Sequence, residues 1–164
     1  MTIAAYLAAD HARLGELLAR ATAHGVDPEA FRAFRGGLLR HIGIEEKLLF
    51  RALERQRGAP HPQAARLHRD HSAIASLLVP TPTPAIVAAL GAVLGPHDEA
   101  EEAPDGVYAA ADALPAAAAA ELLARMQAAR DPPQSAYNDG PAAFRQIAHT
   151  MAAAGIDHPP PTAQ

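Results

Sequence analysis

Apolar residues recur along this chain at alternating spacings of three and four, which is the period of an amphipathic helix with one buried face. The first such stripe consists of Ile3, Leu7, Leu14, Leu18 and Ala21. His11 lies in phase with this stripe, four residues after one leucine and three before the next. We expect this helix to be capped by Thr2 and to run to about His24, where Gly25 stops it.

The second stripe contains two residues that are costly to bury. A helix is expected to begin at Asp27-Pro28, a cap followed by a proline suited to the first turn, and to end near Gly58. Its buried positions are 31, 34, 38, 41, 45, 48 and 52. His41 and Glu45 occupy two of them. A histidine and a carboxylate one turn apart on a buried face are unfavourable unless something satisfies them.

The same arrangement recurs in the next two helices. A third helix is expected from about Pro62 to Leu78, with the stripe Leu67, His71, Ile74 and Leu78. A fourth begins at Thr83-Pro84, with the stripe Ile86, Leu90, Leu94, His97 and Glu101. Pro96 predicts a kink just before His97, and Pro104 predicts that the helix ends or bends there. The kink either orients the candidate ligands that follow it or is an irregularity that the helix tolerates.

Four helices with short connections predict an all-α, antiparallel up-down-up-down four-helix bundle over residues 1–114. The two halves form an internal repeat, each with one histidine on its first helix and His-x-x-x-Glu-Glu on its second. Residues 115–164 predict a C-terminal helical extension. Its helices are expected at Ala116–Gln127 and Pro141–Ala154, and its end, residues 159–164, is expected to be disordered.

Composition narrows the classes of function. The chain has 164 residues, no cysteine and a net charge of -4 without a basic patch, so thiolate chemistry is excluded and nucleic-acid binding is not expected. No apolar run is long enough to span a bilayer, and the N-terminal residues lack the basic start of a signal peptide. We therefore expect a cytoplasmic protein with no membrane partner, and leave a homo-oligomer open.

The six in-phase polar residues predict a metal site. These residues are His11, His41, Glu45, His71, His97 and Glu101. Residues at the centres of four antiparallel helices can meet at one level, where two metal ions would each take two imidazoles and share both glutamates as bridges. Nitrogen ligands combined with oxygen ligands suit iron, with manganese, zinc or cobalt as alternatives. The competing interpretation is a helical protein without metal.

Neighbouring polar and aromatic residues receive secondary interpretations. His68, one turn before His71, is an alternative ligand. Acidic residues beside the candidate ligands are expected to face solvent or to bond a ligand imidazole; these are Asp10, Glu46, Asp70 and Glu102. Tyr6 and Tyr108 are expected to be ordinary core or boundary residues, with lining of the site as the alternative. Surface or capping roles are expected for His24, His61, His149 and His158.

These motifs resemble the haemerythrin-like family, also called the HHE cation-binding domain, over roughly residues 2–114. The resemblance rests on Asp10-His11, His41-x-x-x-Glu45-Glu46, Asp70-His71 and His97-x-x-x-Glu101-Glu102. It implies a non-haem di-iron centre inside a four-helix bundle. The chain departs from the oxygen carriers of the family, which have His-x-x-x-His on the third helix, because Ala75 stands four residues after His71.

The resemblance implies a protein that binds O2, NO or peroxide, or that handles iron, under oxidative or nitrosative stress. The ligand set is closer to that of iron-centre repair proteins, although the cysteine-bearing segment of those proteins is missing here. Two alternatives stay open. One is a di-iron enzyme that decomposes peroxide or acts as an oxidase, and the other is a metal-dependent sensor or interaction module.

Overall fold

The computed structural model describes residues 1–163, which form helices and connecting segments with no strand among them. The elements are α1 (Ile3–Thr22), α2 (Pro28–Ile44), the π-helix η1 (Glu45–Leu49), α3 (Phe50–Arg57), α4 (Ala64–Leu77), α5 (Pro84–Glu102), α6 (Val107–Asp112), α7 (Ala116–Gln127) and α8 (Pro141–Ala154). The predicted all-α class is therefore confirmed for the described part of the chain. The up-down-up-down order and the division at residue 114 remain predictions.

Side-chain caps set the starts of three long helices, as the sequence predicts. Thr2 accepts a hydrogen bond from the amide of Ala5 at 3.2 Å, and Thr83 accepts one from the amide of Ile86 at 3.3 Å. Asp27 caps α2 through the amides of its first turn. These side-chain acceptors satisfy amides that have no partner inside the helix, so each helix begins where its cap stands.

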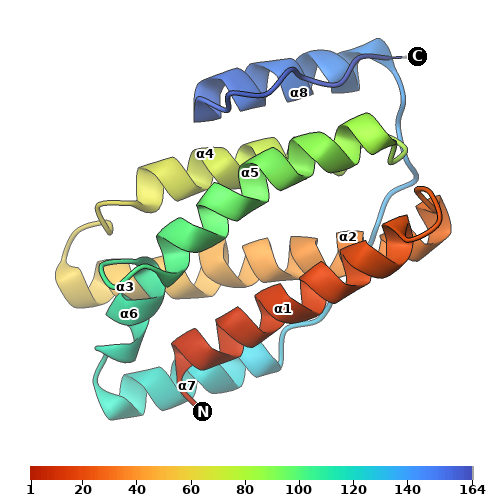
Figure 1. Ribbon diagram of the computed structural model, residues 1–164. Coiled ribbons are helices and arrows are strands. Elements are labelled where there is room, and N and C mark those ends of the chain that lie inside the picture. Colours follow the sequence, from red (N-terminus) through yellow and green to blue (C-terminus); the bar gives the residue numbers. More distant parts are fainter. Residues whose placement is uncertain (164) are drawn as a thin grey trace.

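The helices pack in two pairs with an outer layer (Figure 1). Helix α1 packs along α2, and α4 packs along α5. Helix α8 lies against α4 on the side away from α1, while α7 contacts η1 at the opposite side of the molecule. The short helix α6 touches α1, α3 and α5, so it closes one end of the space between the two pairs.

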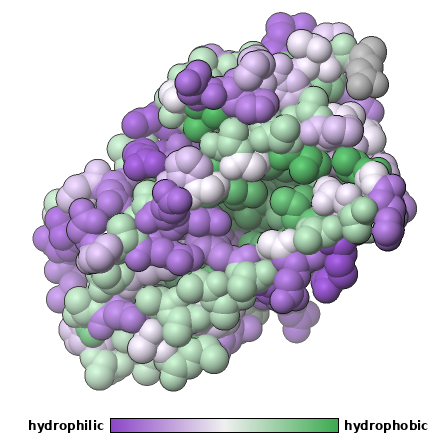
Figure 2. Space-filling model, viewed as in Figure 1, coloured by the Kyte–Doolittle hydropathy of each residue, from purple (hydrophilic) through white to green (hydrophobic). Residues whose placement is uncertain are grey.

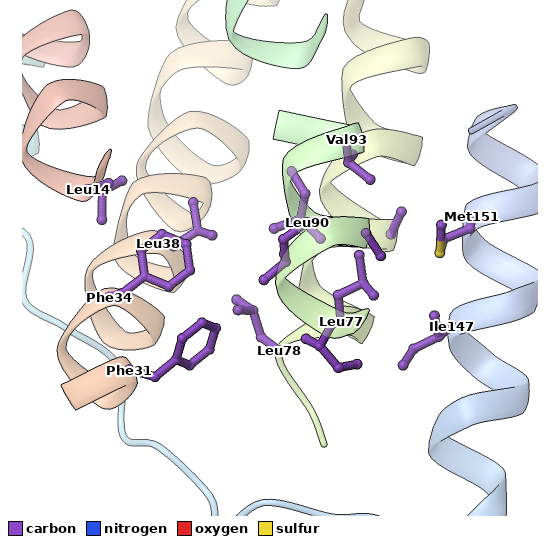
Figure 3. Packing of buried hydrophobic residues seen from close by; sticks show 14 of the residues in the cluster. Leu14, Phe31, Phe34, Leu38, Leu77, Leu78, Leu90, Val93, Ile147 and Met151 are labelled. Carbon is purple, nitrogen blue, oxygen red and sulfur yellow. The ribbon is translucent and has the colours of Figure 1, made fainter. Parts of the chain in front are cut away.

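The apolar core has two parts, separated along the helices by the candidate ligands. One cluster combines Phe31, Phe34 and Leu77 with Ile147 and Met151 of α8 (Figure 3). The other cluster gathers side chains near the α6 end, namely Ile3, Leu7, Ile44, Leu53, Leu67, Val107, Leu122 and Met126. On each of the four long helical segments the in-phase histidine falls between residues of these two clusters, so apolar layers lie on both sides of the polar residues along the helices.

The π-helix η1 shifts the buried face of the second segment by one residue. A π-turn accommodates one extra residue compared with an α-turn. After Glu45 the buried positions are therefore Leu49 and Leu53, whereas the sequence pattern predicted Leu48 and Ala52, which are only half-buried. That part of the prediction is wrong, because it continued an unbroken α-helical period through the insertion.

Two further details bear on the sequence prediction. Helix α5 includes Pro96, where the expected kink stays a prediction, and it ends at Glu102, just before Pro104, as that proline predicts. Helix α6 was not predicted. It begins after Gly106, where an added Cβ would collide with the carbonyl oxygen of Glu101, so only glycine allows the chain to turn this closely.

The residues after α7 are tied to the helices. Arg35 of α2 donates a hydrogen bond to the carbonyl of Ser135 at 2.8 Å, and its guanidinium lies 4.8 Å from the ring centre of Tyr137. Pro161 is buried; the predicted disordered end also includes Gln164, which lies outside the described residues. Within residues 1–163 no single helix is long and apolar enough to cross a membrane, although the bent combination of Pro84–Asp112 with Ala116–Gln127 meets the length and composition test.

Candidate metal centre

The six predicted ligands form two overlapping groups of side chains. The first group is His11, His41, Glu45 and Glu101, and the second is Glu45, His71, His97 and Glu101. In each group one potential ligand atom per residue lies within 4.8 Å of all the others. Five of the six residues are buried, and His11 is half-buried. Residues from four helical segments thus meet at one point, with both glutamates common to the two groups.

The histidines face each other in pairs through their Nε2 atoms. The Nε2 atoms of His11 and His41 are 2.9 Å apart, and those of His71 and His97 are 3.1 Å apart. Two nitrogen ligands about 2.1 Å from one ion lie about 3 Å apart when their bonds are at a right angle. Each pair therefore has the spacing that a single metal ion requires of neighbouring ligands.

The opposite ring nitrogen of every candidate histidine points to a carboxylate. Nδ1 of His11 donates to Glu102 at 2.7 Å, and Nδ1 of His71 donates to Glu46 at 2.6 Å. The remaining two contacts follow the same internal repeat. Nδ1 of His41 lies 3.0 Å from Asp10, and Nδ1 of His97 lies 3.5 Å from Asp70.

These contacts determine which nitrogen can bind a cation. A neutral imidazole has one N–H donor and one lone pair, and a carboxylate can only accept. Protons held on Nδ1 leave the Nε2 lone pairs of each histidine pair facing each other at about 3 Å, which is repulsive unless a metal ion or an additional proton lies between them. Hydrogen bonding of a ligand imidazole to a carboxylate is also the usual support of a metal site in proteins.

Each glutamate spans the two groups. One oxygen of Glu45 lies 3.2 Å from Nε2 of His41, and its other oxygen lies 3.2 Å from Nε2 of His71. Glu101 similarly reaches His97 at 3.3 Å with one oxygen and His11 at 3.6 Å with the other. Oε2 of Glu45 and Oε1 of Glu101 are buried and have no hydrogen-bond partner. Such orphaned buried oxygens are unfavourable, and a bridging carboxylate between two cations would satisfy them.

In the metal-free protein, raised pKa values show that the cluster favours additional positive charge. Burial opposes protonation of His41, but Glu45 and Asp10 outweigh it and raise the pKa of His41 to about 10. Burial likewise opposes protonation of His71, and Glu45 and Glu46 raise its pKa to about 9. Burial and the neighbouring Glu45 raise the pKa of Glu101 well above its usual range. The cluster therefore holds extra protons where metal ions could bring the compensating charge.

Tyr108 of α6 is part of this cluster, although the sequence interpretation favoured an ordinary core or boundary position for it. Its hydroxyl donates to Glu45 at 2.6 Å, lies 3.1 Å from Glu101, and lies 3.0 Å from Nε2 of His11. The residue is almost fully buried. Burial and both carboxylates raise the pKa of Tyr108, so the hydroxyl keeps its proton in the metal-free protein.

The internal repeat is therefore not symmetric at the site. Tyr108 contacts the first group, beside His11 and His41, whereas in the second group the ring of Phe50 stacks on His71 with centroids 5.8 Å apart. One group thus has a hydroxyl donor, and the other has an apolar aromatic wall. The two positions would differ in hydrogen bonding to whatever they hold.

His68, the two buried aspartates and Tyr6 lie outside the two groups of candidate ligands. His68 is mostly exposed and bonds Glu46 at 3.0 Å, so it belongs to neither group of candidate ligands. Asp10 and Asp70 are buried and bond ligand imidazoles, which is the interpretation that the sequence kept beside solvent exposure. Tyr6 is separate from the cluster and donates to the carbonyl of Met126 at 3.3 Å.

A comparison with known protein families finds a match for the first half of the chain. Residues 2–79 match the family model of the hemerythrin HHE cation binding domain. The resemblance of this part of the chain to the haemerythrin-like family is therefore confirmed. No curated protein and no solved structure matches the chain.

The haemerythrin-like match covers the first half of the internal repeat and the first helix of the second half. It includes His11, His41, Glu45 and His71, while His97 and Glu101 lie beyond it. The structure brings these last two residues to the same point as the first four. The family assignment and the His/Glu cluster together support cation binding, and the cluster can hold a metal ion. The identity and number of the ions are matters for a proposal.

Proposed function

We propose that this protein is a non-haem di-iron protein that binds O2, NO or peroxide, or handles iron, under oxidative or nitrosative stress. His11 and His41 would hold one ion, His71 and His97 would hold the other, and Glu45 would bridge them together with Glu101. The finer architecture belongs to this proposal: residues 1–114 form the antiparallel up-down-up-down bundle that carries the centre, and residues 115–164 form its C-terminal extension.

One observation carries the proposal: both Nε2 pairs are aimed inward while every Nδ1 is held by a carboxylate. Four buried histidines arranged in this way would be unfavourable in an apolar core without cations. Imidazole and carboxylate ligands in this ratio suit iron, and manganese or zinc remain alternatives for the same residues. When bound, two iron ions would supply reversible electron transfer and an open position for a small ligand.

The chain's own residues would position and protect such a ligand. The apolar layers above and below the histidines limit the access of water from the two ends of the helices. The hydroxyl of Tyr108 is a hydrogen-bond donor within reach of the first group. This donor favours the enzyme alternative in one respect, because decomposition of peroxide requires a proton beside the reacting oxygen atoms.

A comparison of ligands tests the proposal. Anaerobic, iron-loaded protein is mixed in turn with NO and with peroxide while its visible spectrum and the consumption of peroxide are followed. A spectral change with NO and little turnover of peroxide would support a binding or sensing role, whereas rapid and repeated turnover of peroxide would support the enzyme.

Two variants provide the control for this comparison. His41→Ala removes a candidate ligand and should abolish the response, whereas His149→Ala removes an exposed histidine of α8 and should preserve it. An unchanged response in His41→Ala protein would contradict the proposed site. No response of the wild-type protein to any of the ligands would contradict the proposed function.

A further inference from the structure

An apolar cavity of about 220 Å³ lies beside the first group of candidate ligands. Its walls come from α1, α2, α4 and α5, and its apolar residues include Leu14, Leu18, Phe34, Leu38, Ile74 and Leu94. Figure 2 shows the corresponding hollow between α1 and α5, with apolar surface inside it. At one end of the cavity stand His11, His41 and His97, together with Asp98.

The cavity is a consequence of how two helices face each other. Leu18 of α1 and Leu94 of α5 lie on the stripes that the sequence predicts to be buried, yet both are only half-buried, and both line this cavity. Gly15, Gly91 and Gly95 line it as well, and a Cβ added at any of them would meet no atom within 4 Å. The missing side chains therefore leave open space along this face of the two helices.

The size of the cavity exceeds what a diatomic ligand needs. One water molecule accounts for about 30 Å³ in the liquid, and an apolar cavity of about 150 Å³ can hold benzene. A volume of about 220 Å³ would therefore accept a single ring with a substituent, or a short branched chain. Such a molecule could exchange with solvent, because the cavity opens at the surface between α1 and α5.

The polar end selects among molecules of this size. The carboxylate of Asp98 is partly exposed, with Oδ1 3.8 Å from Nε2 of His11. It can accept a hydrogen bond but cannot donate one, and it would repel an anion. The leucine-rich walls offer no partner for a charged group, and burying an unpaired charge there would be unfavourable. A neutral molecule with one hydroxyl group matches both ends of the cavity.

We propose that this cavity binds a neutral organic molecule with one hydroxyl group, of the class of simple phenols, as substrate or effector. The ring lies among Leu18, Phe34 and Leu94, and the hydroxyl donates to Asp98 beside the histidines. Binding of the ring depends on apolar burial, so it does not require metal. The inference therefore goes beyond the proposed di-iron function and can fail or succeed independently of it.

Binding of phenol to the full chain tests this proposal, with calorimetry and ligand-detected NMR on both metal-free and iron-loaded protein. Toluene has the same ring without the hydroxyl, and benzoate has a ring with a negative charge. We expect phenol to bind most tightly, toluene more weakly and benzoate not measurably. Binding to the metal-free protein would support the cavity even if iron loading failed.

A variant that fills the cavity provides the structural control. Gly91→Leu places a side chain into the open space, and Gly95→Ala is a smaller version in case the first variant does not fold. We expect Gly91→Leu to weaken phenol binding at least about tenfold, as crowding of an apolar pocket does. Gly43→Leu is matched, because Gly43 is also a helical glycine with free space around it but lines a different surface cavity. It should bind phenol normally.

Asp98→Leu tests the polar end separately, and should remove the preference for phenol over toluene while leaving toluene binding intact. Failure of phenol to bind wild-type protein in either metal state would overturn the proposal. Unchanged phenol binding in Gly91→Leu protein would also overturn it. Concentration-dependent dimer formation that is abolished by Gly91→Leu, without phenol binding, would assign the groove to a second copy of this chain instead.

Discussion

At the scale of single residues, the second glutamate of each Glu-Glu pair supports a histidine of the opposite half. Glu102 holds Nδ1 of His11, and Glu46 holds Nδ1 of His71. Loss of such a supporting carboxylate typically weakens metal binding by about 10–100-fold. We expect Glu102→Ala and Glu46→Ala each to weaken the binding of one of two metal ions by about this factor, measured by competition with a chelator.

The matched control for these variants is Glu99→Ala. Glu99 lies on the same helix as Glu102 and is likewise exposed, but in the described part of the chain only Glu102 of these two bonds a candidate ligand. Its removal should change neither binding step. If Glu99→Ala were as damaging as Glu102→Ala, a general loss of negative charge would explain the effect, and the proposed support of His11 would be wrong.

A second residue-scale prediction concerns the hydroxyl of Tyr108. In metal-free protein Tyr108→Phe removes the buried hydroxyl that donates to Glu45 and lies beside Glu101. Hydrogen bonds to charged groups contribute about 1.5–3 kcal/mol, so urea unfolding should show a loss of about this size. Tyr6→Phe removes a single bond to a backbone carbonyl and should cost less. An equal or smaller loss in Tyr108→Phe protein would place its hydroxyl outside the cluster.

The sequence pointed to the six candidate ligands because each of them is in phase with an apolar stripe. The spacing of residues along a helix reveals which side chains share a buried face. Because the same arrangement of histidine and glutamate occurs in both halves of the chain, it would rarely arise by chance. Tyr108 has no such signal, because it stands on a six-residue helix that follows a turn. Gly106 was a usable hint, since a glycine beside the end of a helix often marks a close approach of two backbone segments.

At the scale of elements, the π-helix η1 changes which side chains of the second segment are buried. One extra residue rotates everything that follows by about 100° relative to an unbroken α-helix. Deletion of the exposed Lys47 should convert the π-turn into an ordinary α-turn and keep Leu49 and Leu53 on the buried face, because it moves them onto the positions that an unbroken α-helix buries. We therefore expect the thermal unfolding midpoint to stay close to that of the wild-type protein.

Lys47→Ala is the control for this deletion, since it keeps the residue count and removes only an exposed side chain. It should unfold at the wild-type temperature. A deletion protein that unfolds far below the temperature of the Lys47→Ala protein would show that η1 does not accommodate one extra residue.

Helix starts were predictable from Thr2, Asp27 and Thr83 because capping is local chemistry between a side chain and nearby amides. The π-helix was not, because a period of 3.6 residues continues to fit on either side of it. Pro96 predicts a kink, and α5 includes this proline within one helix. The exposed position of Pro96 lets water reach the carbonyl group that its ring leaves without a partner.

At the scale of the whole molecule, the C-terminal helices complete the apolar core. Ile147 and Met151 of α8 are buried against α4, and Leu122 and Met126 of α7 belong to the cluster at the opposite end (Figure 1). The sequence predicted both helices but not where they pack, because an apolar stripe does not specify its partner. The contact between Arg35 and Tyr137 joins residues a hundred positions apart and leaves no local pattern.

The two apolar layers around a polar cluster predict that metal stabilises the fold. A ligand that binds only the folded state at a free concentration of 100 times its dissociation constant adds about 2.7 kcal/mol to the free energy of unfolding. Iron-loaded protein should therefore unfold at a higher temperature than metal-free protein, and a chelator should reverse the shift. Identical unfolding curves would contradict a cation shared by the helices.

The most direct test of the central claim is the metal content per chain, measured with the optical spectrum on protein purified in air without added chelator or nickel resin. The arrangement of two Nε2 pairs and two shared glutamates predicts about two irons per chain and near-ultraviolet bands from a coupled iron pair. A chain that contains no metal, and still takes up none after anaerobic loading with ferrous iron, would contradict the proposed metal centre.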